Sequence, residues 1–216
     1  MTQQSEQSEQ FNEAFWDQRY SSRTALWSGN PNPNLVAQAT ELAPGHALDV
    51  GCGEGADAVW LARRGWQVTA ADLSGVALRR AAEHAAQAGA GIAERIAWLH
   101  ADLTLTDPGK ERFDLVSAQY LHLPPEPRAA LYRSLAAATA PGGILLVVAH
   151  HPSDLQTTVP RPNIPELFFT GDDIAALLGP DAWEIEVNTA APRPATDPEG
   201  RAVTIHDTVL RARRRA

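Results

Sequence analysis

A glycine-dense turn at residues 51–55 is the part of this sequence most closely tied to chemistry. A short apolar run at residues 47–50 leads into the turn, and a helix-like segment at residues 56–62 follows it. Glycines remove the Cβ atoms that would keep a ligand away from the backbone, and a helix beginning directly after the turn offers free N–H groups. A turn of this kind after the first strand of an α/β sheet is a nucleotide-type cofactor site.

Three aspartates stand where they would lie beside such a cofactor. Asp49 lies inside the first expected strand, where a carboxylate is costly unless it is hydrogen-bonded. Asp72 ends the second expected strand, roughly 20 residues after Gly51, where an acid binds both ribose hydroxyls of NAD or of another adenosine ligand. Asp102 follows the third expected strand, where it would meet an adenine amino group. The alternatives are a helix-capping role for Asp72 and a simple turn role for Asp102.

Polar aromatic side chains also stand at the ends of the fourth and fifth expected strands. Tyr120 and His122 follow the fourth strand, and His150 and His151 end or follow the fifth. Open α/β sheets carry out their reactions at this edge. Because histidine titrates near neutral pH, His122 is the first choice for a general base or acceptor contact, with Tyr120 and His150 as further catalytic candidates. A packing or hydrogen-bonding role is the alternative for each of them.

The elements that must position these residues alternate between strand and helix. Strands are expected at residues 47–51, 67–71, 96–100, 113–118 and 144–150, and helices at 54–64, 75–88 and 126–139, with a turn at 140–143. A short helix at 172–178 and strands at 183–188 and 203–211 complete the pattern, while the proline-rich stretch 192–198 reads as a loop. We expect an α/β fold with a Rossmann-like doubly wound sheet, mostly parallel with an antiparallel C-terminal edge pair.

Length, composition and charge limit the classes of protein that fit. The 216 residues, 44% of them hydrophobic and 20% charged, suit one globular domain. The net charge of −8 argues against a general nucleic-acid binder. The basic run at residues 211–215 is expected to be a solvated tail, with contact to a polyanion as the alternative.

The cysteine content and the N-terminus predict a cytoplasmic protein. Cys52 is the only cysteine, so no intrachain disulfide can form, and its place in the turn suggests a small filler residue and not a nucleophile. Residues 1–10 are polar and lack the apolar core of a secretory signal. No apolar run approaches the length that spans a membrane, so no membrane partner is expected.

Taken together, these motifs resemble the class I S-adenosylmethionine-dependent methyltransferases. Asp49-x-Gly51-x-Gly53-x-Gly55 matches the first motif of that family, and Asp72-Leu73-Ser74 matches its second-strand acid. Asp102 matches the third-strand acid, residues 113–116 the fourth strand and residues 140–143 the turn before the fifth. The five motifs stand in the family's order across residues 47–149, and the family's sheet also ends in an antiparallel strand.

The resemblance implies S-adenosyl-L-methionine as the cofactor. The glycines would pass under its methionine part, with Asp49 ordering the turn or a water near the amino group. The acid after the second strand would bind the ribose, and the residues after the third strand the adenine. The cofactor-binding residues implied in the sheet are Asp49, Gly51, Cys52, Gly53, Gly55, Asp72, Leu73, Asp102, Leu103 and Gln119.

The N-terminal region is similar to that of the tellurite-resistance and thiopurine methyltransferases, in which a helix and loop close over the cofactor. The similarity rests on Trp16-x-x-Arg19-Tyr20 and on Trp27-Ser28-Gly29. It implies that Arg19 pairs with the cofactor carboxylate and that Trp27 stacks on the sulfonium. The alternative is that these aromatics only dock the helix. The expected layout is a disordered tail at 1–10, a helical lid at 11–45 and a methyltransferase domain at 46–216, within a single globular domain overall.

The function implied is methyl transfer to a small-molecule acceptor by in-line displacement. A non-catalytic S-adenosylmethionine-binding regulatory protein is the alternative. A short-chain oxidoreductase is excluded because it needs a Tyr-x-x-x-Lys pair, and the only lysine, Lys110, has Thr106 at the required position. No metal is expected, because the magnesium-dependent members use acids after the fourth strand and residues 117–119 carry none. The acceptor and the oligomeric state stay open.

Overall fold

The computed structural model describes residues 12–216, which fall into two compact units divided between residues 107 and 108. The expected disordered tail at residues 1–10 lies outside the described residues. Each unit has its own strands and helices, and each is described by itself. Among residues 12–216 no helix combines the length and the apolar character needed to cross a membrane.

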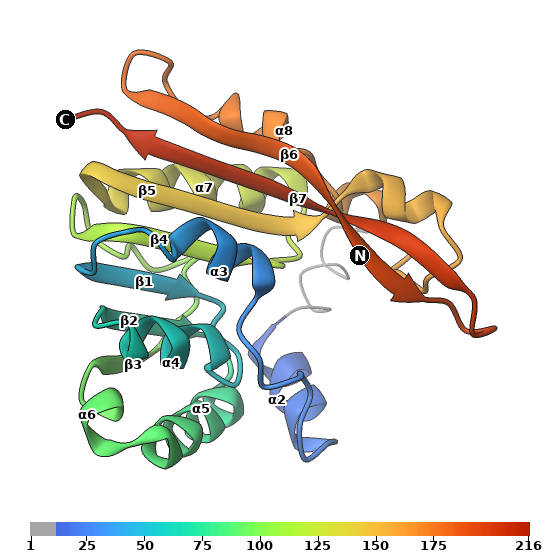
Figure 1. Ribbon diagram of the computed structural model, residues 1–216, viewed down its shortest axis with the longest axis horizontal. Helices are drawn as coiled ribbons and strands as arrows, with labels where there is room; N and C mark the ends of the chain where they lie inside the picture. The colour runs from blue at the N-terminus through green and yellow to red at the C-terminus, as the bar shows by residue number, and fades with distance from the viewer. Residues whose placement is uncertain (1–11) are drawn as a thin grey trace. The chain divides into compact units, whose positions relative to one another are not determined.

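The first unit contains three parallel strands in the order β3-β2-β1 (Figure 1). The strands are β1 (His46–Val50), β2 (Gln67–Asp72) and β3 (Ile96–His100), and the helices are α2 (Glu13–Ser21), α3 (Pro33–Ala39), α4 (Ala56–Arg63), α5 (Gly75–Ala88) and α6 (Ala90–Ala93). Helices α4 and α5 pack on β2 and on each other. Each strand ends at the edge where the glycine turn begins, because parallel strands share one direction.

Local side-chain caps fix where the helices of this unit begin. Asn12, Asn32 and Ser74 each stand at the N-cap of their helix and accept a hydrogen bond from a backbone N–H of the first turn. Helix α4 has no such side chain, because Gly55 occupies its N-cap in the left-handed conformation. The start of α4 is therefore set by the glycine turn itself.

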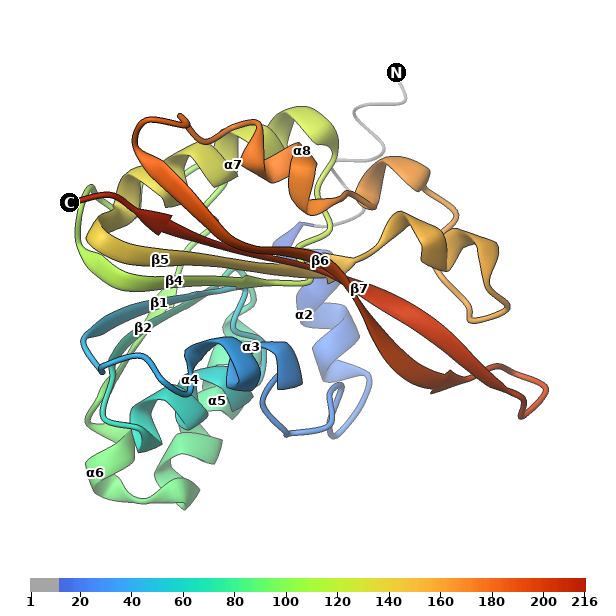
Figure 2. The same cartoon turned by 45° about the horizontal axis from the view of Figure 1, so that its top comes forward.

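The second unit contains four strands in the order β4-β5-β7-β6. The strands are β4 (Phe113–Gln119), β5 (Thr139–His150), β6 (Trp183–Thr196) and β7 (Ala202–Arg214), and the helices are α7 (Pro125–Ala138), α8 (Gly171–Ala175), η1 (Pro152–Gln156) and η2 (Pro165–Leu167). Strand β5 runs parallel to β4, and β7 runs antiparallel to both β5 and β6. Figure 2 shows β6 and β7 as one long twisted ribbon.

Two expectations about this unit are wrong. The turn expected at residues 140–143 is an irregular start of β5, where the register against β4 shifts and Gly142 has a φ of +79°. The stretch 192–198 is not all loop, because Pro192 and Pro194 belong to β6 and pair with His206 and Thr204. Proline is tolerated there because β6 is the edge strand, where a missing N–H leaves no neighbour unpaired. The parallel strands, the connecting helices and the antiparallel edge pair agree with the predicted α/β class.

Candidate active site

The glycine turn after β1 is built from left-handed backbone. The φ angles of Gly51, Gly53 and Gly55 are +68°, +53° and +82°, values that residues with a Cβ rarely adopt. The N–H groups of Gly51 and Cys52 both donate to the carbonyl oxygen of Ala71, at 2.8 and 3.0 Å. The turn is therefore fastened to the end of β2, and its glycines carry no side chains of their own that would keep a ligand away.

Asp72 joins the turn to the start of α5. Its Oδ2 accepts the N–H of Gly53 and its Oδ1 accepts the N–H of Ser74, both at 2.8 Å. Burial raises the pKa of Asp72 above its usual value, and these two hydrogen bonds act in the opposite direction. Since each carboxylate oxygen can accept about two hydrogen bonds, Asp72 retains capacity for further donors such as ribose hydroxyls.

Asp49 is a buried carboxylate with an unsatisfied oxygen. Its side chain is 2% exposed within β1, and the backbone N–H of Ala58 donates to it. Its Oδ2 has no hydrogen-bond partner among the described residues. Burial, followed by the charges of Asp57 and Asp72, raises the pKa of Asp49 well above its usual value. Such an acceptor fits a cationic or amino donor placed against the turn.

Two aromatic side chains cover the glycine turn. A Cβ at Gly53 would lie 2.9 Å from the Tyr20 hydroxyl and 3.3 Å from Nε1 of Trp27, so no larger residue fits there. The Trp27 indole N–H donates to the Tyr20 hydroxyl at 3.1 Å. Tyr20 is buried, whereas Trp27 is 51% exposed. The predicted lid thus reaches the turn through Tyr20 and Trp27.

Glu54, between two glycines of the turn, holds the lid in place. Its carboxylate accepts the backbone N–H groups of Leu26 and Trp27, each at 3.1 Å, and pairs with Arg80 at 3.0 Å. Arg80 also donates to the carbonyl oxygen of Arg23 at 2.7 Å. Glu54 was not predicted as a functional residue, although its position between Gly53 and Gly55 could have indicated a role in the site.

Arg19 does not come to the turn. Its guanidinium lies 5.9 Å from the ring centre of Trp16, on the exposed side of α2. The same helix docks through Asp17, which accepts hydrogen bonds from the Ser74 hydroxyl and the Val76 N–H at the start of α5. Tyr20, one residue after Arg19, is the side chain of this motif that contacts the site.

The two residues predicted to meet the adenine follow β3. Oδ1 of Asp102 accepts hydrogen bonds from the N–H and the hydroxyl of Thr104, at 2.8 and 2.6 Å, so Asp102 does form the turn named as its alternative role. Leu103 is buried beside it. Leu73, after Asp72, binds the ring of His100 through its carbonyl oxygen at 3.0 Å. An adenine contact by Asp102 stays a prediction.

In the second unit, the three predicted catalytic residues form one cluster. The ring centres of Tyr120 and His150 are 4.7 Å apart, those of His122 and His150 are 5.5 Å apart, and Phe168 lies 6.3 Å from His150. Gln119 lies at the end of β4, where its amide donates to the Ser117 hydroxyl at 2.7 Å. The sequence thus selected residues that meet in space, although 30 positions of chain separate some of them.

An ion pair between Arg193 and the buried Asp207, which was not predicted from the sequence, orients Tyr120. The guanidinium of Arg193 donates two hydrogen bonds, of 2.9 and 3.1 Å, to the carboxylate of Asp207, which is fully buried. The Tyr120 hydroxyl hydrogen-bonds to both partners, and burial, followed by the Asp207 charge, raises its pKa above the usual value. Tyr120 has a φ of +51°, an uncommon conformation for a residue with a side chain. The strained backbone and the ion pair together fix the ring beside His150.

His150 is held in its neutral form. Burial lowers its pKa to about 3, with further lowering from Arg161 and His122. Its Nδ1 is buried without a hydrogen-bond partner among the described residues. His151 instead binds Ser153 at 2.9 Å. Residues 12–216 contain no group of three or more His, Cys, Asp or Glu side chains arranged to hold a metal ion.

Residues 47–143 match the model of a family described as a methyltransferase domain. The chain is also 30% identical over 162 residues to a 2-heptyl-1-hydroxyquinolin-4(1H)-one methyltransferase from Mycobacteroides abscessus, covering 69% of this chain and 70% of that protein. This chain belongs to the S-adenosylmethionine-dependent methyltransferases. Other curated relatives match at 40% identity over 124 residues, and the chain spans 59% of their length.

Solved structures extend the similarity of this methyltransferase to 94% of the chain. One of them was described for the conversion of a disulfide bond into a thioacetal group during echinomycin biosynthesis. It has a TM-score of 0.74 at 25% identity, and the match covers 92% of its chain. TehB from Haemophilus influenzae has a TM-score of 0.68 at 20% identity, with 67% of its chain covered. The predicted family, Rossmann-like fold class, enzyme class and cofactor are confirmed.

The buried Asp49 of this methyltransferase gives a first prediction. Because its folded pKa is raised, its charge destabilises the fold as the pH rises above about 4, the ordinary pKa of aspartate. Asp49→Asn keeps an acceptor for the Ala58 N–H and is expected to increase the free energy of unfolding by on the order of 1 kcal/mol at pH 8. This gain in stability should disappear near pH 4, where the side chain at position 49 is uncharged in the folded state of both proteins. Thermal unfolding of the two proteins at the two pH values measures it, and a loss of stability at pH 8 would contradict it.

Proposed function

We propose that this protein transfers the methyl group of S-adenosyl-L-methionine to a small-molecule acceptor by in-line displacement. The observation that carries the proposal is the left-handed glycine turn, tied to β2 and closed by Asp72. The cofactor supplies an activated methyl group on a sulfonium. The protein then has to bind the cofactor and the acceptor, orient them and exclude water. Positioning of this kind is the main source of acceleration in such a displacement.

The cofactor is expected to lie against the first unit. The bare backbone of Gly51 and Gly53 would accommodate the methionine part, and the unsatisfied Oδ2 of Asp49 would accept from its ammonium group or from a bridging water. Asp72 would accept from the ribose hydroxyls while it keeps the Gly53 and Ser74 N–H groups. Trp27 would shield the sulfonium, a favourable cation–aromatic contact.

The acceptor residues are proposed from the second unit. Nδ1 of His150 is neutral and has no hydrogen-bond partner among the described residues, so it would accept a hydrogen bond from an acceptor hydroxyl or N–H. Tyr120 would orient the acceptor through its ring and hydroxyl, held by Arg193 and Asp207. His122, the first choice from the sequence, would then be an acceptor contact. A thiolate acceptor would need no base.

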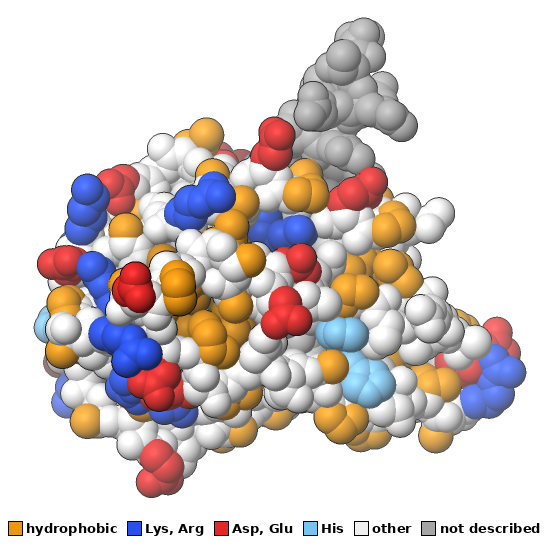
Figure 3. All heavy atoms as spheres, turned by 90° about the horizontal axis from the view of Figure 1, so that it is seen from above, with side chains coloured by type: hydrophobic (Ala, Val, Ile, Leu, Met, Phe, Trp, Pro, Cys, Tyr) orange, Lys and Arg blue, Asp and Glu red, His pale blue; other side chains and the backbone are white. Residues whose placement is uncertain are grey.

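The proposed partner is a small molecule, and neither nucleic acid nor a membrane. The relative from Mycobacteroides abscessus is named for a heteroaromatic hydroxyl compound, which supports an acceptor of this size. On the face drawn in Figure 3, acidic and basic side chains are interspersed, and the chain carries a net charge of −8. We also propose a cytoplasmic location. For the chain's organisation, we propose a helical lid at residues 11–45 followed by a methyltransferase domain at residues 46–216.

Two measurements test the proposed function. Calorimetric titration should give tight binding of S-adenosylhomocysteine and none of NADH. Incubation with S-adenosylmethionine and a panel of thiols, phenols and hydroxyquinolines should then release S-adenosylhomocysteine with at least one of them. Binding of NADH alone would overturn the cofactor assignment. Binding of S-adenosylhomocysteine without turnover of any acceptor would favour the regulatory alternative.

The lid gives a second prediction. Trp27→Ala is expected to weaken binding of S-adenosylmethionine, which carries the sulfonium charge, by about 3- to 10-fold, within the range of a cation–aromatic contact. The melting temperature should change little, because half of the indole is exposed. Leu105→Ala, at a side chain that is 86% exposed, serves as the control for removal of a surface apolar group. A large drop in melting temperature with unchanged affinity would mean that Trp27 only packs the lid.

A further inference from the structure

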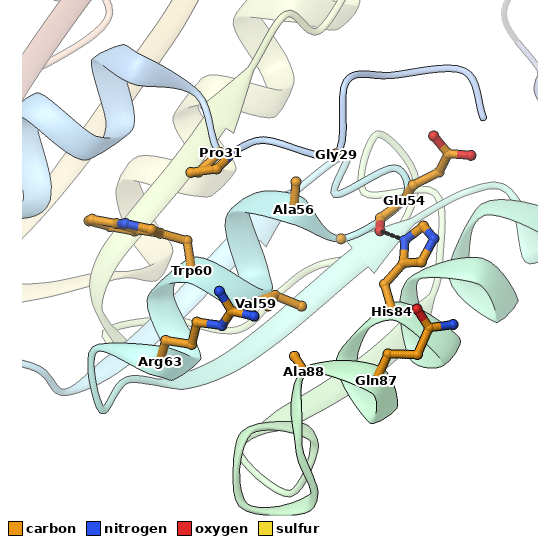
Figure 4. A pocket seen from close by; sticks show the side chains of 11 residues that line it. Gly29, Pro31, Glu54, Ala56, Val59, Trp60, Arg63, His84, Gln87 and Ala88 are labelled. Atoms are coloured by element: carbon orange, nitrogen blue, oxygen red, sulfur yellow. Dashed lines mark hydrogen bonds between the residues drawn. The ribbon is translucent and has the colours of Figure 1, made fainter.

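A pocket of the first unit lies along α4 and α5 (Figure 4). Its volume is about 340 Å³, within the range of small-ligand sites. Its walls come from α4, α5 and the loop at residues 29–31. Asp49, Asp72 and Gly53, which mark the proposed cofactor site, do not line it. The pocket touches the glycine turn only through Glu54 and Gly55.

The polar groups of this pocket favour an anion. Arg63 is exposed, has no hydrogen bond or ion pair among the described residues, and turns its guanidinium into the pocket beside Val59 (Figure 4). Gln87 likewise has no hydrogen-bond partner there. The one acid in the lining, Glu54, is already neutralised by Arg80 and bonded to two backbone N–H groups. The free charge of the pocket is therefore positive, although the chain carries −8 overall.

The remaining walls favour a flat apolar body. Trp60 and Val59 from α4 and Pro31 from the loop line the pocket together with two alanines. The Trp60 ring is steadied by Arg64, whose guanidinium carbon lies 5.3 Å from the ring centre. An indole presents a broad face on which an aromatic ring stacks well. We propose that this pocket is an effector site for a planar aromatic carboxylate, with Arg63 binding the carboxylate and Trp60 the ring.

The position of the pocket connects such a ligand to the lid. Its walls include Gly29 and Pro31, which lie in the loop shortly after Trp27, and Glu54, which accepts a hydrogen bond from the backbone N–H of Trp27. His84, also in the lining, donates to the carbonyl oxygen of Glu54 at 3.0 Å. A ligand that bridges the loop and the two helices stabilises the arrangement in which the lid covers Gly53. If the lid retains the cofactor, a step that rests on the proposed function, the ligand increases cofactor affinity by linkage.

The probe for this site is 2-naphthoate, with the uncharged 2-naphthamide as its control ligand. Calorimetry on the full chain should give saturable binding of 2-naphthoate, at least tenfold weaker in Arg63→Gln and at least tenfold weaker for 2-naphthamide. Arg79→Gln, at an exposed arginine of α5 outside the pocket, should bind like the unmodified protein. Absence of binding, equal binding by Arg63→Gln, or displacement of the probe by S-adenosylhomocysteine would overturn the site.

The effector role has its own measurement. Saturating 2-naphthoate should tighten S-adenosylhomocysteine binding by about threefold or more, and Arg63→Gln should abolish this change without altering the affinity measured in the absence of the probe. An unchanged or weaker affinity would overturn the effector role. If S-adenosylhomocysteine does not bind at all, the proposed function fails, while the direct titration of 2-naphthoate still decides whether the pocket is a binding site.

Discussion

Replacing Asp72 with alanine is expected to weaken S-adenosylhomocysteine binding by about 1.5–3 kcal/mol, roughly 10- to 150-fold, the scale of a lost charged hydrogen bond. The carboxylate is expected to bind the ribose, and it also fixes the Gly53 N–H and the Ser74 N–H. Its removal therefore affects the ligand contact and the shape of the glycine turn together. Isothermal titration of the variant and the unmodified protein measures the effect.

Two comparison variants separate these contributions. Asp72→Asn keeps one acceptor oxygen, so it can hold only one of the two backbone N–H groups, and an intermediate loss of affinity is expected. Asp102→Ala removes an acid whose observed bonds go to Thr104, so a smaller loss is expected unless Asp102 binds the adenine. Unchanged affinity in Asp72→Ala would show that Asp72 is not part of the cofactor site.

The parts of the fold that local sequence determines were predicted closely. The bounds expected for β3, residues 96–100, and for α5, residues 75–88, are those of the structure. Strand β3 is a compact run between turn residues, and α5 begins at the capping residue Ser74 and ends before Gly89. The glycine turn was also found, because its chemistry depends on backbone conformation and on few neighbours.

The antiparallel edge pair was predicted, but the full length of its strands was not. Strand β6 is 14 residues long because β7 pairs with it along most of that length, and no local pattern contains this information. The ion pair between Arg193 and Asp207 likewise joins positions on two strands of the same hairpin, and its contact with Tyr120 depends on the order of the sheet. The contact of Tyr20 with the glycine turn was not predicted for a related reason, since the rotation of α2 is fixed by the bonds of Asp17 to α5.

The catalytic cluster gives the prediction with the largest expected effect on rate. His150→Phe is expected to reduce kcat about 10-fold or more for an acceptor that must lose a proton, such as a phenol, because Nδ1 is the proposed hydrogen-bond acceptor for its hydroxyl. Turnover of a thiol that is already ionised should fall only a few-fold. Binding of S-adenosylhomocysteine should be unchanged within about twofold. Tyr132→Phe, which removes a buried hydroxyl with no partner among the described residues, is the control for a change in the interior of the same unit.

The pH dependence and the ratio of the two rate losses test the role of His150 together. Since the pKa of His150 is lowered to about 3, its ring is uncharged from about pH 5 upward, and it contributes no titration to kcat between pH 5.5 and 8. A limb in this range that persists in His150→Phe would come from another group. An equal loss of rate with phenol and thiolate would instead mean that the His150 ring only supports Tyr120 and Phe168, which stand 4.7 and 6.3 Å from it. The ratio of the two losses, more than either loss alone, therefore decides whether this neutral histidine accepts a hydrogen bond from the acceptor hydroxyl.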